Sequence, residues 1–247
     1  MFTFPSTLVD SQTLYAVSNT GAVDFEFDSS QSALISDVSQ NGALDVTGAI
    51  TIECWLKIES FPGNTGVLSK WGSGAAIQRS WYLMFVSQTG WRFALWDQAN
   101  GLNPIAAWDP GVTTGVWYHL AWTHDPNIAA PKFEMFKNGT SLGKQDSFAH
   151  ADIGLINNGT GDFNVGASST NIGVPANFFD GKIDEVRIWN VIRTQTQIND
   201  NKAIELVGNE SGLVGYWKLN GDFTDSTSNG NHLSGYNGPA FTTDVPF

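Results

Sequence analysis

The sequence predicts an all-β protein, a two-sheet antiparallel β-sandwich with one short helix. Three observations support this fold class. Of 247 residues, 26 are glycine, 10 tryptophan and 16 phenylalanine, and only 15% are charged, so the strong helix formers Glu, Lys and Arg are scarce. Apolar and polar residues alternate along many short segments, which is the pattern of half-buried strands. Clusters of Gly, Asn, Asp and Pro separate these segments, and one sandwich commonly takes roughly 200–250 residues.

The clearest strand covers residues 49–58. Apolar residues at every second position, from Ile50 to Ile58, share one side, and Thr51 and Glu53 fall on the other. Other segments show similar patterns. In chain order, the expected strands are residues 24–27, 49–58, 67–71, 81–86, 92–96, 118–123, 132–137, 163–166, 181–189 and 214–219.

One helix is expected at residues 193–204. Thr194 or Thr196 is its candidate cap, and Ile198 shares a face with Lys202, so we expect the helix to lie against the sandwich. No charge block, long linker or low-complexity run divides the chain. The sequence therefore predicts one domain over residues 21–247, preceded by an N-terminal arm of residues 1–20.

The charge balance excludes several partners. Twelve Lys and Arg stand against 24 Asp and Glu, which gives a net charge of −12. Such a chain repels phosphate backbones and anionic lipid, so nucleic acid is not an expected partner. The longest apolar runs have the length of strands, so no membrane insertion is expected. The single cysteine, Cys54, excludes an intramolecular disulfide.

Motifs in the second half of the chain resemble a known family. Residues 179–190, FDGKIDEVRIWN, resemble the FxGxIDEVRIWN signature of LamG-like (laminin G, pentraxin-related) jelly-roll domains of the concanavalin A-like lectin/glucanase superfamily. Further segments are similar to other motifs of that family in the same order: residues 49–58, 117–123, 133–139, 162–167, 192–198, 213–219 and 225–231. The resemblance spans residues 21–247 and implies a concanavalin A-like jelly roll with a concave and a convex face.

Catalysis is not expected. The superfamily's glucanases carry acidic residues along one strand face, and here only Asp24, Glu26 and Asp28 alternate in that way. This segment corresponds to the family's first strand rather than to its catalytic strand, so we interpret it as an edge strand with solvated carboxylates. Sequence motifs of nucleophilic and metal-dependent hydrolases are absent as well. The sequence predicts a protein that is not an enzyme.

A calcium ion is one interpretation of the segment at residues 225–231. Asp225, Asn229 and Asn231 supply one carboxylate and two amides, and Ca²⁺ prefers such oxygen ligands. Because related domains hold calcium near the corresponding segments, the resemblance adds Asp184 and, less strongly, Asp28. The alternative is an Asx-turn that the same side chains close without an ion. If calcium binds, we expect a structural role.

Ten tryptophans are more than a sandwich core needs, and half of them gather between residues 70 and 108. Polar side chains are interleaved with them, and a sugar combines apolar C–H faces with a polar rim. The predicted ligand-binding residues are Trp71, Arg79, Trp81, Arg92, Trp96 and Trp108. The alternative is that these rings fill the space between the sheets or cover a loop.

Two functions compete. The first is a non-catalytic, lectin-like module that binds glycans, with or without calcium. The second is a structural or adhesion protein, such as a virion appendage or a surface assembly subunit, which forms homo-oligomers through the arm of residues 1–20. The chain begins with Met and shows no signal peptide, as a phage particle protein would. Both functions predict an extracellular, cell-surface or virion location.

Overall fold

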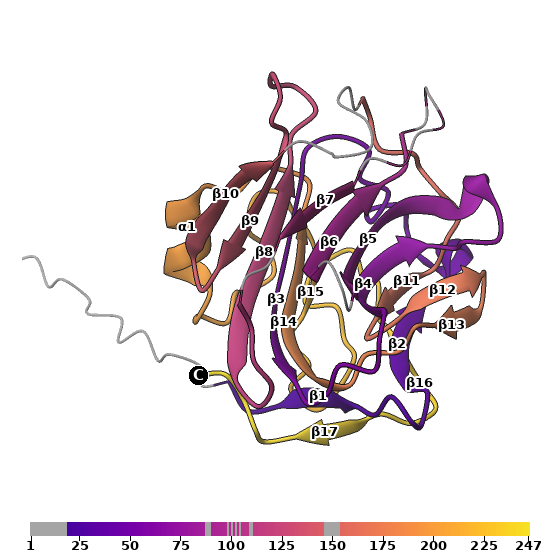
Figure 1. The fold of residues 1–247 in the computed structure, drawn as a ribbon. Coiled ribbons are helices and arrows are strands. Elements are labelled where there is room, and N and C mark those ends of the chain that lie inside the picture. The colour runs from indigo at the N-terminus through magenta and orange to yellow at the C-terminus, as the bar shows by residue number, and fades with distance from the viewer. Residues whose placement is uncertain are drawn as a thin grey trace, which may run out of the picture.

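The computed structural model describes residues 19–86, 90–97, 99, 101, 103, 105–108, 111–145 and 154–247. Most of the predicted arm lies outside these residues, so the arm and its role in assembly stay predictions. The described chain forms two large antiparallel sheets that face each other, with one α-helix (Figure 1). The predicted all-β sandwich is confirmed. Among the described residues, no helix is long and apolar enough to cross a membrane.

The first sheet, called sheet A, has eight strands. Its strands in spatial order are β10 (Thr140–Gln145), β9 (Phe133–Lys137), β8 (Trp117–His124), β3 (Ile50–Ile58), β14 (Gly181–Trp189), β1 (Ala22–Phe25) and β17 (Ala240–Thr242), and β15 (Leu213–Trp217) also pairs with β14. Asp24, which was expected on an edge strand, therefore lies in an internal strand, because β1 pairs with β14 and β17, and Glu26 and Asp28 follow that strand. The C-terminal strand β17 is too short and too exposed to produce an alternation signal.

The second sheet, called sheet B, has seven strands. Its order is β16 (Ser234–Tyr236), β2 (Ser32–Ile35), β11 (Phe163–Val165), β4 (Thr65–Trp71), β5 (Arg79–Val86), β6 (Gly90–Leu95) and β7 (Ile105–Trp108). A separate hairpin, β12 (Ser168–Asn171) with β13 (Val174–Ala176), packs against β4. Two short 3-10 turns, η1 (Asp37–Ser39) and η2 (Ala76–Gln78), precede β3 and β5.

The hydrophobic core fills the space between the two sheets. From sheet A it takes the alternate residues of β3, including Ile52 and Cys54, and from sheet B residues such as Leu83 and Phe93. Cys54 is fully buried, and desolvation raises the pKa of its thiol. The thiol therefore stays protonated and packs as a small apolar group.

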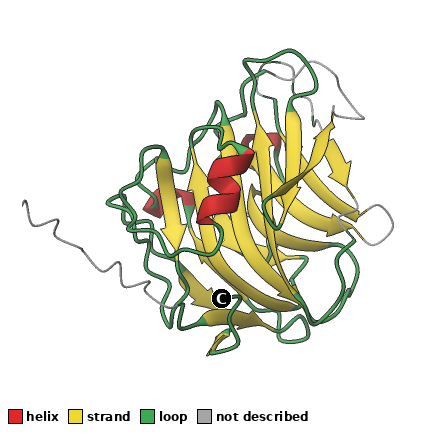
Figure 2. Cartoon of the chain, turned by 90° about the vertical axis from the view of Figure 1, so that its left-hand side faces the viewer, coloured by secondary structure: helices red, strands yellow, loops and turns green. Residues whose placement is uncertain are grey.

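The single helix, α1 (Gln195–Asn201), covers the outer face of sheet A (Figure 2). Thr194 caps it in a capping box: its hydroxyl accepts from the Gln197 N–H, and the Gln197 side chain accepts from the Thr194 N–H. Ile198 packs on Ala121 and Phe136 of the sheet. The helix lies where the sequence predicts it, although it is shorter than residues 193–204.

Candidate functional site

A pocket of about 240 Å³ opens on the outer face of sheet B. Strand β5 forms its floor, because Trp81 and Leu83 point into the core while Tyr82 and Met84 line the pocket. The other lining residues come from both ends of the β4–β5 connection, from the β12–β13 hairpin and from the segment before β7. They are Trp71, Ser73, Arg79, Asn103, Ser168, Ser169 and Asn177.

Close backbone packing holds the hairpin wall of this pocket on β4. The Gly66 N–H donates to the carbonyl of Asn177, and the Ser73 N–H donates to the carbonyl of Ser169. A Cβ atom at position 66 would lie 2.3 Å from the backbone nitrogen of Ser168. Glycine at position 66 therefore permits the approach that builds the wall.

Arg79 lies close to two indole rings, which meet each other edge-on, at one end of the pocket. Its Cζ lies 4.6 Å from the ring centroid of Trp96 and 5.5 Å from that of Trp71. The Trp71 ring in turn meets the Tyr82 ring edge-on, with 4.9 Å between the centroids. Such cation–π contacts restrict the position of the guanidinium group. The pocket thus has an aromatic wall with a positive charge embedded in it.

Polar groups without internal partners lie in the same pocket. Arg79 Nη2 donates to the carbonyl of Ser73, at 3.1 Å, but its buried Nε has no hydrogen-bond partner among the described residues. Asn103 forms a side-chain hydrogen bond with Tyr82, while its buried Oδ1 finds no partner within the described part of the chain. Burial raises the pKa of Tyr82, so this hydroxyl stays protonated at neutral pH. These groups can bind a polar ligand.

The structure places two of the predicted ligand-binding tryptophans in the hydrophobic core. Trp81 and Trp108 belong to the hydrophobic core between the sheets and do not line the pocket, whereas Trp71, which is also buried at 6% exposure, does line it. Trp71, Arg79 and Trp96 do come together. Arg92, on β6, lies opposite Met84, and its charge acts on Tyr82.

Sequence reasoning missed the remaining pocket residues. Tyr82 lies in a run of residues that are apolar in both phases, and Asn103 lies in a segment without periodicity. Ser168, Ser169 and Asn177 belong to a hairpin whose sequence does not alternate.

The predicted calcium loop is closed by its own hydrogen bonds. Asp225 Oδ1 accepts from the N–H groups of Tyr216 and Thr227, and Asp225 Oδ2 accepts from the Thr227 hydroxyl and the Asn231 N–H. The four acceptor positions of a carboxylate are then used. Asn229 donates to the carbonyl of Val214. In this arrangement the residues fit the Asx-turn rather than an ion.

The two other candidate calcium ligands lie apart from that loop. Asp184 is fully buried and accepts hydrogen bonds from Asn19 Nδ2 and the Glu185 N–H. Desolvation raises the pKa of Asp184 to about 8. Asp28 is exposed in the turn after β1. Calcium binding stays a prediction.

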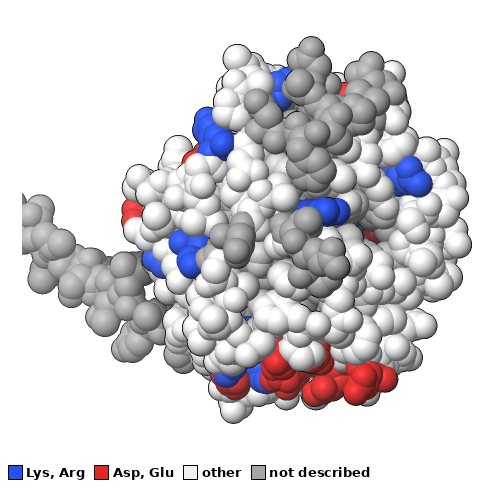
Figure 3. Space-filling view, in the orientation of Figure 1, with Lys and Arg blue, Asp and Glu red and all other residues white. Residues whose placement is uncertain are grey.

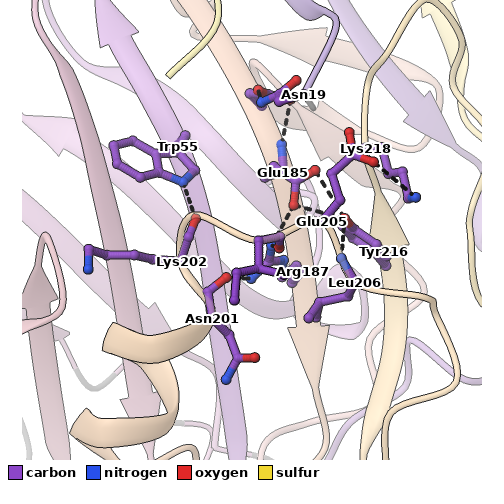
Figure 4. Close-up of polar contacts among 12 residues, drawn as sticks. Asn19, Trp55, Glu185, Arg187, Asn201, Lys202, Glu205, Leu206, Tyr216 and Lys218 are labelled. Atoms are coloured by element: carbon purple, nitrogen blue, oxygen red, sulfur yellow. Dashed lines mark hydrogen bonds and ion pairs between the residues drawn. The ribbon is translucent and has the colours of Figure 1, made fainter. Parts of the chain in front are cut away.

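The family motif residues form a buried polar cluster between sheet A and the segment that follows α1 (Figure 4). Arg187 pairs with Glu185 and also donates to the carbonyls of Asn201 and Ile204. The Tyr216 hydroxyl donates to Glu185. These contacts fix the segment to the sheet, and we interpret the cluster as structural.

Glu53, on β3, is a further buried charged residue of sheet A. It accepts a hydrogen bond from Trp189 Nε1, and His119 Nε2 lies 3.3 Å from its other oxygen. Burial alone would raise the pKa of Glu53, but the hydrogen bond from His119 and the charge of Arg187 outweigh burial and lower it to about 2. Desolvation lowers the pKa of His119, which therefore stays neutral at pH 7.

Acidic side chains gather at one edge of the molecule, near β1 and β17 (Figure 3). Carboxylate oxygens of Asp24, Glu26 and Glu59 lie within 4.8 Å of one another. Lys182 forms ion pairs with Asp24 and Glu59. Such ion pairs are common for carboxylates at a protein surface. Desolvation and the neighbouring carboxylates raise the pKa of Glu26.

Solved structures with the same fold are known, although their sequences differ widely. A proposed carbohydrate-binding protein from Bacteroides ovatus has 21% identity and a TM-score of 0.67 over 93% of this chain, which spans 62% of its length. A heptameric SAP-like pentraxin from Limulus polyphemus has 12% identity and a TM-score of 0.56, covering 92% of this chain and 97% of its own. CBM40 of the Ruminococcus gnavus IT-sialidase, bound to α2,3-sialyllactose, has 15% identity and a TM-score of 0.53, covering 72% and 95%.

The family is shown by the sequence itself. No curated protein matches the chain. Residues 9–199, well over half of the chain, match the model of one family, and the resemblance of the sequence motifs leads to the same family. Its fold is the sandwich described above. The chain therefore belongs to the concanavalin A-like lectin/glucanases superfamily.

Proposed function

We propose that this protein is a carbohydrate-binding module that holds a sugar residue in the pocket on the outer face of sheet B. The observation that carries the proposal is the cluster of Trp71, Arg79 and Trp96 beside unpartnered polar atoms of Arg79 and Asn103. A sugar ring has apolar C–H faces that pack on aromatic rings. Its hydroxyl groups can satisfy the polar atoms that the protein leaves without partners.

The size of the pocket sets the size of the ligand. Its volume of about 240 Å³ is below the roughly 300–1,000 Å³ of pockets that enclose a drug-sized ligand. One sugar residue fits such a space, with the rest of a glycan chain outside it. The hairpin wall offers Ser169 and Asn177 to hydroxyl groups on the side opposite the indoles.

The descriptions of two structural neighbours support this proposal. The Bacteroides protein is described as a proposed carbohydrate-binding protein, and CBM40 is bound to a sialylated sugar. A module of this kind would meet its glycans outside the cell or on a virion, which is the location we propose. We also propose that it binds without turnover, and that calcium is not needed at the pocket.

A glycan array tests the proposal, probed once with calcium and once with EDTA. We expect binding that survives EDTA and that falls in Trp96→Ala, because the Trp96 ring contacts Arg79, which lines the pocket. Trp117→Ala is the matched control, since it removes a partly exposed indole from sheet A. Incubation of bound glycans with Glu26→Gln and the unmodified protein checks for turnover.

The alternatives give different results. Binding that EDTA abolishes and Trp96→Ala leaves unchanged would place the site at a calcium ion elsewhere. Turnover that Glu26→Gln abolishes would make the protein a glycosidase. The absence of binding to a broad array would contradict the proposed function.

A further inference from the structure

We infer that the pocket selects a sugar that carries an anionic group, a carboxylate or a sulfate, and that Arg79 binds this group. The inference rests on the proposed function and names its ligand class. It starts from the charge of the pocket, which is opposite to the charge of the molecule. The whole chain has a net charge of −12, yet no carboxylate is found among the described residues that line the pocket, and Arg79 is there.

Arg79 has no ion pair with the described residues, in contrast to five other cations of the described chain. Lys57, Lys70, Lys182, Arg187 and Lys218 each contact at least one carboxylate. Arg79 has no carboxylate within ion-pair distance among the described residues, although its side chain is half-buried and its Nε is fully buried. Burying part of a charge without a counter-ion costs free energy, and a bound anion would supply the missing partner.

The geometry around Arg79 suits an anion with two oxygens. The Trp71 and Trp96 rings both lie within cation–π distance of the guanidinium group and restrict its position. One Nη2 hydrogen bond goes to the backbone of Ser73, which anchors the side chain and leaves other guanidinium N–H groups to donate. A planar guanidinium held in this way matches the two oxygens of a carboxylate or a sulfate, a match that lysine does not offer.

Arg92 and the hairpin wall flank the site. Arg92 lies on the neighbouring strand β6, close enough for its charge to act on Tyr82. Ser169 lines the far wall and can bind a hydroxyl group of the same sugar, whereas the Ser168 hydroxyl donates to the carbonyl of Ala176. A neutral sugar could also accept a hydrogen bond from Arg79, but hydrogen bonds in which both partners are charged are markedly stronger.

The test compares pairs of immobilised glycans that differ only in the acidic group. Suitable pairs are a glucuronide and a glucoside, a galacturonide and a galactoside, sialyllactose and lactose, and a 6-sulfated galactoside and a galactoside. We expect the acidic member of at least one pair to bind about 10- to 100-fold more tightly. The uronide and sialyl pairs report on a carboxylate, and the sulfated pair reports on a sulfate ester.

Variants of Arg79 connect that preference to the proposed residue. In Arg79→Gln both members should lose affinity, because Arg79 lines the pocket, but the acidic member should lose about 10-fold more than the neutral member. Arg79→Lys should restore only part of the preference, because it keeps the charge and loses the planar fork. Arg193→Gln is the matched control, since Arg193 also stacks on an indole, 4.1 Å from the Trp189 centroid, but on sheet A.

The outcomes distinguish the selection of an acidic sugar from carbohydrate binding itself. Equal binding of acidic and neutral members, or an acidic preference that Arg79→Gln keeps, overturns the inference and leaves carbohydrate binding intact. No binding by any member, while thermal unfolding shows folded protein, contradicts the proposed function itself. If Arg79→Gln fails to fold, Arg79→Lys and the wild-type glycan pairs still decide the question.

Discussion

Lys70 is the residue that departs most from what its position in the sequence suggests. It lies in strand β4, yet its side chain is only 1% exposed and ends among oxygen atoms from three segments. Its Nζ lies 2.8 Å from Asp37, 3.0 Å from Asp45 and 2.5 Å from the carbonyl oxygen of Gly159. One buried ammonium therefore ties two loops to sheet B.

Replacing Lys70 tests this role. Lys70→Met should lower the free energy of unfolding by about 3–5 kcal/mol, because it leaves two carboxylates and a carbonyl without their cation. Urea denaturation measures the change. Lys57→Met is the control: its ion pair with Asp244 is partly exposed, so its loss should cost at most about 1 kcal/mol. Equal losses of unfolding free energy in the two variants would show that burial does not strengthen the ion pairs of Lys70.

Successive residues of a strand point to opposite faces of the sheet, so the site receives only every second side chain. The sequence shows which residues these are only where polar and apolar residues alternate. In residues 91–96 the alternation correctly places Arg92 on the face opposite Trp91 and Phe93. In residues 81–86 both phases are apolar, so the pattern could not show that Trp81 faces the core and Tyr82 faces the pocket. The error at Trp81 has this cause.

At the scale of elements, alternation identifies the long strands and misses the short ones. Each of the predicted strands overlaps an observed strand. The strands that were missed include β10, β16 and β17, which are largely exposed, and the β12–β13 hairpin, which pairs mainly with itself. Because that hairpin forms one wall of the pocket, the complete site could not be predicted from periodicity.

The contact between this hairpin and β4 can be tested at a single glycine. Gly66→Ala places a Cβ atom 2.3 Å from Ser168 N and 2.4 Å from Ala167 C, and both are backbone atoms that cannot turn away. We expect a loss of about 1–3 kcal/mol in the free energy of unfolding, together with weaker glycan binding as the wall moves. Urea denaturation and the glycan array measure the two effects.

Gly48→Ala is the matched control for this element. A Cβ atom at Gly48 would have no heavy atom within 4 Å, so the substitution should leave both glycan binding and packing unchanged. If Gly66→Ala behaves like Gly48→Ala, the hairpin is not held against β4 in the way described.

At the scale of the whole molecule, stability depends on two buried carboxylates whose pKa values move in opposite directions. The pKa of Glu53 is lowered to about 2, so its contribution is present above its ordinary value of 4.5 and is lost as pH falls toward 2. The pKa of Asp184 is raised to about 8. Its contribution is present below its ordinary value of 3.8 and is lost as pH rises toward 8, since the unfolded chain releases a proton that the folded chain keeps.

Asp184→Asn isolates the second effect, because asparagine mimics the uncharged carboxyl group at every pH. The stability of the variant relative to the wild type should rise between pH 4 and pH 8, with a slope that approaches about 1.4 kcal/mol per pH unit, and should level off above that range. Urea denaturation at a series of pH values measures the difference. A constant difference between Asp184→Asn and the wild type would mean that Asp184 is ionised in the folded protein.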